Sequence, residues 1–242
     1  MKVLLFADGH VGYSIAKYLI ENYLLDLQCI VTTEHNDISI LSERAKINTI
    51  VYKDDLTLIR KTSGSELGLL AWWPLVIKQP LLSICESGFI NTHPSLLPNN
   101  RGKHPNFWAI VEEGRFGVSL HYVEPEIDAG DLIAQREIIY DWLDTGQSLY
   151  EEAEKAMIDL FVEQYPNIRN NKSLRRPQDL SAGSFHFAKE IDPQSHIFLE
   201  KTYTGREILN LLRARTFAGR PGCFFNDNGE TYEINIAIEK KK

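Results

Sequence analysis

Short apolar runs alternate with segments of helical spacing through the first half of this chain, and this alternation constrains the fold more than any other feature. The apolar runs have the length of buried strands and lie at residues 2–6, 27–32, 49–52, 67–72 and 88–91. Between them, apolar residues recur with helical periodicity at 13–23, 38–46 and about 56–63. Such a pattern is typical of a parallel sheet covered by helices on both faces. We therefore expect an α/β fold with a mostly parallel sheet.

The later part of the chain adds elements and then changes composition. Strands are expected at 118–123 and 132–139, and helices at 105–113 and 148–165. A polar, proline-containing stretch at 167–183 predicts a boundary between a catalytic domain of residues 1–180 and an appendage of residues 181–242.

The appendage is predicted to hold a helix at 205–212 and a β-hairpin at 222–225 and 230–238. Asn226, Asp227, Asn228 and Gly229 supply the turn between these two strands. A two-stranded hairpin is barely stable alone, so it should pack on the main domain or pair with a second subunit. The whole prediction is a Rossmann-like sheet plus a small C-terminal helix and hairpin.

Charge and cysteine content narrow the class of protein. The net charge is -7 and the pI is near 5.5, which disfavours a broad nucleic-acid surface. The first residues lack the pattern of a signal peptide and are too short a run to span a bilayer. Cys29, Cys85 and Cys223 are scattered in apolar surroundings, as in reduced core positions. We expect a cytoplasmic protein without nucleic-acid or membrane partners.

Polar side chains that could do chemistry follow the predicted strands. Asn91 and His93 stand two residues apart at a strand end, so their side chains leave on the same side, and Pro94 then turns the chain away. In parallel sheets ligands bind at the carboxyl ends of strands, which places His10 and the loop after residue 71 at the same rim. A capping asparagine and a core histidine remain the alternative, and Asp128 alone reads equally well as a turn residue.

Two other kinds of site fit the sequence poorly. The first loop has only Gly9 and Gly12, not the three glycines of a dinucleotide fingerprint. No second histidine or cysteine lies at ligand spacing from His93, because His104 and His121 fall in different predicted elements. We expect no metal.

The motif of residues 89–98 (FINTHPSLLP), with Arg101-Gly102 and the loop Asp128-Ala129-Gly130-Asp131, resembles the formyltransferases that use 10-formyltetrahydrofolate. The resemblance covers about residues 1–165. It implies that Asn91, His93 and Asp128 form the catalytic group, and that two loops hold the pterin of 10-formyltetrahydrofolate largely through backbone atoms. The implied folate-binding residues are Trp73, Pro74, Leu75, Val76, Ile77, Glu126, Ile127 and Asp131.

The resemblance also suggests a branch of that family. The first loop lacks the serine- and glycine-rich phosphate loop of glycinamide ribonucleotide enzymes. The chain is too short and acidic for a methionyl-tRNA enzyme, and its motif begins too early for a formyltetrahydrofolate hydrolase. Sugar N-formyltransferases remain, with dTDP-4-amino-4,6-dideoxyglucose as the expected acceptor in O-antigen synthesis. dTDP-3-amino-3,6-dideoxyglucose and GDP-perosamine are alternatives, and a non-catalytic nucleotide-binding protein is the alternative of another class.

Acceptor binding needs cations for the diphosphate and an aromatic wall for the base. The candidates with suitable chemistry are His10, Arg101, Gly102, Lys201, Tyr203, Arg213, Phe217 and, as further cations, Arg215 and Arg220. Arg213 and Phe217 are four residues apart and would share a helix face if the helix continues. The hairpin suggests a homodimer.

Overall fold

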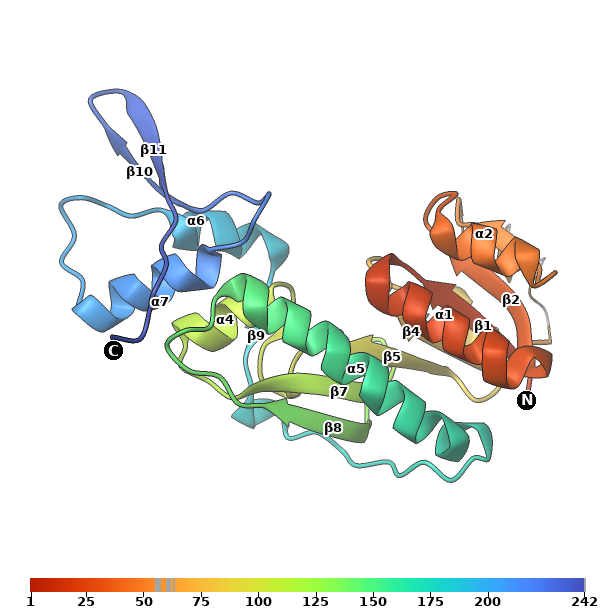
Figure 1. Cartoon of the computed structure of the whole chain (residues 1–242). Coiled ribbons are helices and arrows are strands. Elements are labelled where there is room, and N and C mark those ends of the chain that lie inside the picture. Colours follow the sequence, from red (N-terminus) through yellow and green to blue (C-terminus); the bar gives the residue numbers. More distant parts are fainter. Residues whose placement is uncertain (55–57, 60–61, 63, 242) are drawn as a thin grey trace. The chain divides into compact units, whose positions relative to one another are not determined.

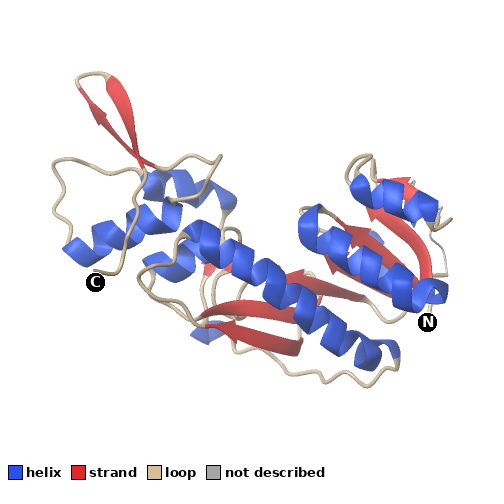
Figure 2. Ribbon diagram, viewed as in Figure 1, coloured by secondary structure: helices blue, strands red, loops and turns tan. Residues whose placement is uncertain are grey.

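A computed structural model of this chain describes residues 1–54, 58–59, 62 and 64–241. Its main feature is a seven-stranded sheet in the order β3-β2-β1-β4-β5-β7-β8 (Figures 1 and 2). The strands are β1 (Val3–Ala7), β2 (Leu27–Thr32), β3 (Thr49–Val51), β4 (Leu67–Ala71), β5 (Phe89–His93), β7 (Phe116–Tyr122) and β8 (Leu132–Ile138). The first five strands pair in parallel and β7 pairs antiparallel with β5. The predicted mostly parallel α/β sheet is confirmed.

Helices lie where the spacing predicted them, and one short helix, α6 (Ile191–Ser195), was not predicted. They are α1 (Gly9–Tyr23), α2 (Asp37–Arg44), α4 (Pro105–Val111), α5 (Gly146–Arg169), α6 (Ile191–Ser195) and α7 (Gly205–Arg215). The helix predicted around 56–63 falls mostly outside the described residues. None of the helices in the described ranges is both long and apolar enough to cross a membrane.

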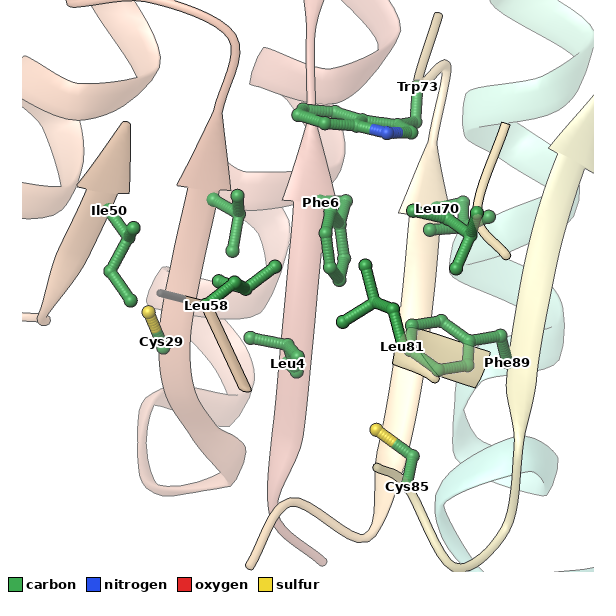
Figure 3. Packing of buried hydrophobic residues seen from close by; sticks show 12 residues of the cluster. Leu4, Phe6, Cys29, Ile50, Leu58, Leu70, Trp73, Leu81, Cys85 and Phe89 are labelled. Carbon is green, nitrogen blue, oxygen red and sulfur yellow. The ribbon is translucent and has the colours of Figure 1, made fainter. Parts of the chain in front are cut away.

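The sheet core is apolar on both faces of β1. Val3 and Leu5 alternate with Leu4 and Phe6, and all four side chains are fully buried. On one face, Leu4 and Phe6 join a cluster with residues of the neighbouring strands and loops (Figure 3). Because both faces are covered, β1 reads as a continuous apolar run and not as an alternating one.

The start of α1 is fixed against the ends of two strands. Asp8 caps the helix, its side chain accepting from the backbone nitrogen of Gly9 at 2.9 Å. A Cβ at Gly12 would lie 3.0 Å from the carbonyl oxygen of Ala71, so any other residue would push the helix and β4 a few tenths of an ångström apart. These contacts fix the backbone beside the exposed His10.

Internal contacts divide the chain into two compact units. The first unit holds Met1–His93, Ser119–Gln135 and Met157–Gln178, and the second holds Pro94–Val118, Arg136–Ala156 and Asp179–Lys242. The domain boundary expected between residues 180 and 181 stays a prediction.

The second unit contains the predicted C-terminal elements. Two short strands, β6 (Arg101–Gly102) and β9 (Phe185–His186), pair in parallel, and α4 contacts α7. The hairpin of β10 (Cys223–Asp227) and β11 (Glu230–Ile234) is present, with Asn228 and Gly229 both at positive φ in its turn. That geometry is the one Asn-Gly favours between antiparallel strands.

Candidate active site

The end of β5 brings two predicted site residues to one side of the sheet. Asn91 pairs with His121 and His93 pairs with Ser119 across the antiparallel β5–β7 contact. His93 is 5% exposed, and its Nδ1 lies 3.5 Å from Oδ2 of Asp128. Nε2 of His93 is buried and has no hydrogen-bond partner among the described residues. This nitrogen is therefore available to exchange a proton with a bound ligand.

Asp128 reaches the site from the loop between β7 and β8. Its backbone adopts φ 54°, and its Oδ1 lies 3.5 Å from Nδ2 of Asn91. Gly130 permits the close return of this loop, since a Cβ there would lie 2.0 Å from the carbonyl oxygen of Tyr122. The structure thus brings Asn91, His93 and Asp128 together, as the sequence predicted.

Gln178 clamps this loop and was missed by the sequence reasoning. Its side-chain nitrogen donates to the carbonyl oxygens of Asp128 at 2.9 Å and Gly130 at 2.6 Å. It stands in the stretch expected to be a domain boundary, where the polar composition gave no signal of a role in the site. Its contacts hold the backbone that presents the Asp128 carboxylate.

His121 is the second residue that the sequence reasoning missed. It is 1% exposed, and its Nε2 lies 3.2 Å from Nδ2 of Asn91 and 3.6 Å from Oδ1 of Asp128. The sequence reasoning set His121 aside as a partner of His93 because it lies in another predicted element, but the fold brings the two residues together. Ligand atoms of His93, His121 and Asp128 all lie within 4.8 Å of one another. Only the antiparallel pairing of β7 with β5 reveals this, because His121 is remote in sequence.

The protonation state of His121 follows from its surroundings. Its pKa is lowered to about 4, mainly by burial and also by the nearby His93, while Asp128 and the backbone of Tyr122 oppose the shift. Its Nδ1 lies 2.8 Å from the carbonyl oxygen of Tyr122, which can only accept, so Nδ1 carries the hydrogen. The neutral ring then presents an Nε2 lone pair to the Asn91 amide.

The loop predicted to hold the pterin begins at a fixed turn. Trp72 has φ 56°, and its backbone nitrogen donates at 2.8 Å to the hydroxyl of Thr92, which in turn donates to the carbonyl of Leu70. The next side chain, Trp73, packs edge-on against Phe6 with ring centroids 5.2 Å apart (Figure 3).

Side chains of the two folate loops divide into buried and exposed sets. Trp73 and Ile77 belong to the buried cluster, so they attach the loop to the hydrophobic core. Leu75, Val76 and Ile127 are 45%, 55% and 40% exposed. Each of these side chains therefore leaves apolar surface available to a ligand. The roles assigned to these residues, and to Pro74, Glu126 and Asp131, stay predictions.

In the second unit, several predicted acceptor residues already have partners. Arg213 is 5% exposed and donates to the side chain of Asn210 and to the carbonyls of Asp141 and Asp144. The hydroxyl of Tyr203 accepts from the backbone nitrogen of Phe198, and Lys201 lies over its ring at 4.8 Å. Arg101 and Gly102 lie in β6. These assignments to acceptor binding stay predictions.

Other positively charged side chains of the second unit lie near His104 and are better candidates for binding the diphosphate. Burial lowers the pKa of His104, and the positive charges of Arg215, Arg220 and Lys103 lower it further. Nε of Arg215 is buried and has no hydrogen-bond partner in the described part of the chain, although its Nη2 pairs with Asp192 at 2.7 Å. Positive charge is therefore concentrated here, where an anion would be bound favourably.

An aromatic pair accompanies this group. The guanidinium of Arg220 lies 4.4 Å from the ring centre of Phe217 and 5.6 Å from that of Tyr150. The two rings meet at an interplanar angle of 66° with centroids 5.6 Å apart. Cations beside aromatic rings are the side-chain types that a nucleoside diphosphate requires.

Comparison with known families identifies the class of protein that this fold and site define. Residues 32–164 match the model described as formyl transferase, and residues 190–240 match the N-formyltransferase dimerization C-terminal domain. The first match covers more than half of the chain. The chain belongs to the formyl transferase family.

Among curated proteins, the chain is similar to a dTDP-4-amino-4,6-dideoxyglucose formyltransferase of Mycobacterium tuberculosis. The two are 27% identical over 154 residues, which is 63% of this chain and 65% of that protein. The match therefore spans less than two thirds of the curated relative.

Solved structures share the fold. A 4-N formyltransferase from Francisella tularensis superposes with a TM-score of 0.84 at 24% identity, covering 99% of this chain and 98% of that one. A formyltransferase from Anoxybacillus kamchatkensis, solved with UDP-4,6-dideoxy-4-formamido-L-AltNAc and tetrahydrofolate, has a TM-score of 0.60 at 25% identity and covers 87% of this chain and 97% of that one.

Proposed function

We propose that this protein transfers a formyl group from 10-formyltetrahydrofolate to the amino group of a nucleotide-linked amino-deoxysugar. The observation that carries the proposal is the convergence of Asn91, His93 and Asp128 at the end of β5, with Nδ1 of His93 3.5 Å from the Asp128 carboxylate. An amide donor, an imidazole and a carboxylate are the groups that acyl transfer to an amine requires. Membership of the formyl transferase family supports the same reaction.

The proposed chemistry assigns one task to each side chain. The amine lone pair attacks the formyl carbon, and His93 takes the proton that the nitrogen loses. The carbonyl electrons move to oxygen, where Asn91 donates a hydrogen bond to the oxyanion. Collapse re-forms the carbonyl and breaks the bond to the folate nitrogen, which leaves with the electron pair and takes up the proton that His93 holds. Asp128 holds the His93 ring and stabilises its charged form.

Folate binding is proposed for the two loops at this end of the sheet. Their exposed Leu75, Val76 and Ile127 offer apolar surface, and their backbone groups can bind the polar edge of the pterin. The relative from Anoxybacillus kamchatkensis, which was solved with tetrahydrofolate, supports this assignment.

For the acceptor, dTDP-4-amino-4,6-dideoxyglucose is the first candidate, because the curated Mycobacterium tuberculosis relative carries that name. dTDP-3-amino-3,6-dideoxyglucose and GDP-perosamine are the alternatives, and O-antigen synthesis is the proposed use of the product. Within the second unit, Arg215, Arg220 and Lys103 are the favoured diphosphate cations, with Phe217 and Tyr150 beside them. Arg213 is a weaker candidate because its buried guanidinium already binds backbone carbonyls.

A homodimer and a cytoplasmic location complete the proposal. The match of residues 190–240 to a dimerization domain supports the dimer, which light scattering after size exclusion would test. The three cysteines are buried free thiols, as a reducing compartment allows.

The reaction is tested by mixing the protein with 10-formyltetrahydrofolate and each candidate amino sugar. Release of tetrahydrofolate is followed by absorbance, and the formylated sugar by mass. We expect turnover with one amino sugar, and none with dTDP-glucose, which lacks the amine. His93→Asn should abolish most turnover while nucleotide-sugar binding survives.

The same assay separates the rival function. A non-catalytic nucleotide-binding protein would bind the nucleotide sugar and release no tetrahydrofolate with any amine. Near-normal turnover by His93→Asn would instead overturn the assignment of the proton acceptor.

A further inference from the structure

The cluster of His93, His121 and Asp128 has the composition of a transition-metal site. Two imidazoles and a carboxylate each offer a ligand atom, and the three atoms lie within 4.8 Å of one another. Imidazole and carboxylate are common zinc ligands. We propose that this cluster binds Zn²⁺ and that the bound ion blocks formyl transfer.

The distances between ligand atoms fit tetrahedral zinc. Zinc binds nitrogen and oxygen at about 2.1 Å, which separates two ligands at a tetrahedral angle by about 3.4 Å. Asp128 oxygens lie 3.5 Å from Nδ1 of His93 and 3.6 Å from Nε2 of His121. These two distances are to different oxygens of the carboxylate, Oδ2 and Oδ1, so binding through one oxygen needs a small rotation of the Asp128 side chain.

His121 is oriented by a hydrogen bond from its other ring nitrogen, as histidine ligands of zinc usually are. Nδ1 of His121 donates to the carbonyl oxygen of Tyr122 at 2.8 Å, which leaves the Nε2 lone pair for a metal. The side chains of His93, His121 and Asp128 are all buried or nearly so. Few waters therefore compete for the ligand atoms. The Asn91 amide, 3.2 Å from Nε2 of His121, must give up that hydrogen bond.

Zinc at this position removes the groups that the reaction needs. His93 and Asp128 cannot accept a proton while their lone pairs bind the metal, and Asn91 loses its partner. The inhibitory half of the inference rests on the proposed function, whereas zinc binding itself does not.

Binding is tested on the full chain by competition with a chromophoric zinc chelator. We expect one Zn²⁺ per chain in the wild type. His121→Gln should weaken binding more than tenfold, since loss of even an outer partner of a metal ligand typically costs about 10–100-fold. Asp128→Asn provides a second variant, because asparagine tolerates the positive φ at that position. The matched control is His35→Gln, which removes a histidine that is 64% exposed and pairs with Glu43.

Inhibition is measured on the wild type in the formyl-transfer assay. We expect stoichiometric Zn²⁺ to reduce turnover more than tenfold, EDTA to restore it, and Mg²⁺ to have no effect because it prefers oxygen ligands. Equal zinc affinity in the wild type and both cluster variants overturns the site. Unchanged turnover with zinc bound overturns the inhibition. Absence of turnover in metal-free protein contradicts the proposed function instead, and leaves the binding result to decide the site.

Discussion

Nδ2 of Asn91 lies 3.2 Å from Nε2 of His121, the residue directly opposite it on β7. His121 is neutral and its Nε2 can only accept a hydrogen bond. The Asn91 amide is therefore oriented with its nitrogen, and not its oxygen, facing His121. The amide nitrogen of Asn91 thus lies between His121 and Asp128, and its long 3.5 Å contact with Oδ1 of Asp128 is the one that the proposed oxyanion would replace. His121 does not exchange a proton in the proposed reaction but positions Asn91, the oxyanion donor.

The buried neutral state of His121 predicts a pH-dependent stability. Its pKa is about 4 in the folded protein against 6.5 in the unfolded chain, so below pH 6.5 the unfolded state binds more protons. The contribution of neutral His121 to the free energy of unfolding is fully present above pH 6.5 and is lost as the pH falls from there towards 4. The loss attributable to this group is about 2 kcal/mol between pH 7 and pH 5. Urea unfolding at several pH values measures it.

His121→Gln should flatten this dependence, because glutamine does not titrate. The exposed His35→Gln serves as control and should keep the wild-type slope. Parallel curves for wild type and His121→Gln would show that His121 is not responsible.

Asn91→Ala removes the proposed oxyanion donor. We expect turnover to fall about 10²–10³-fold, as for loss of one such donor in other acyl transfers. Binding of the nucleotide sugar should change little, because the hydrogen bond forms mainly in the transition state. Asn22→Ala, at an exposed position of α1, is the matched control and should keep full activity. A loss of binding without a loss of turnover at saturation would contradict this role.

Gln178→Ala releases the loop that carries Asp128. Two hydrogen bonds to backbone carbonyls are lost, so the carboxylate is held less firmly against His93. We expect kcat to fall about 10–100-fold, the effect of a small misplacement of a catalytic group. Steady-state kinetics should show the effect mainly in kcat, and Gln178→Glu should not restore it because a carboxylate cannot donate. The control is Gln164→Ala, whose side chain donates to its neighbour Glu163 and not to the Asp128 loop in the described part of the chain.

Tyr165→Phe removes a buried hydroxyl that donates to Asp26 at 3.1 Å. Tyr165 is fully buried and Asp26 is 3% exposed, so the carboxylate loses a donor that water replaces poorly. We expect the free energy of unfolding to fall by about 1–2 kcal/mol, measured by urea denaturation. Tyr13→Phe, at a half-buried position of α1, should change it by much less. Equal effects of the two substitutions would mean that the hydrogen bond to Asp26 contributes nothing.

Local sequence determined much of this protein. The apolar run of β1, the Asn-Gly turn of the hairpin and the two-residue spacing of Asn91 and His93 each follow from backbone geometry within a few residues. The motif that includes Asn91 and His93 also identified the family, which the match over residues 32–164 confirms.

Tertiary structure alone decided what surrounds those residues. His121 joins Asn91 because β7 pairs antiparallel with β5 in one register, and a shift of one residue would turn its side chain to the other face. Gln178 reaches the Asp128 loop from fifty residues away in sequence, and Trp73 packs in the buried cluster beneath its loop. Such contacts depend on long-range pairing and packing, whose energies no short stretch of sequence contains.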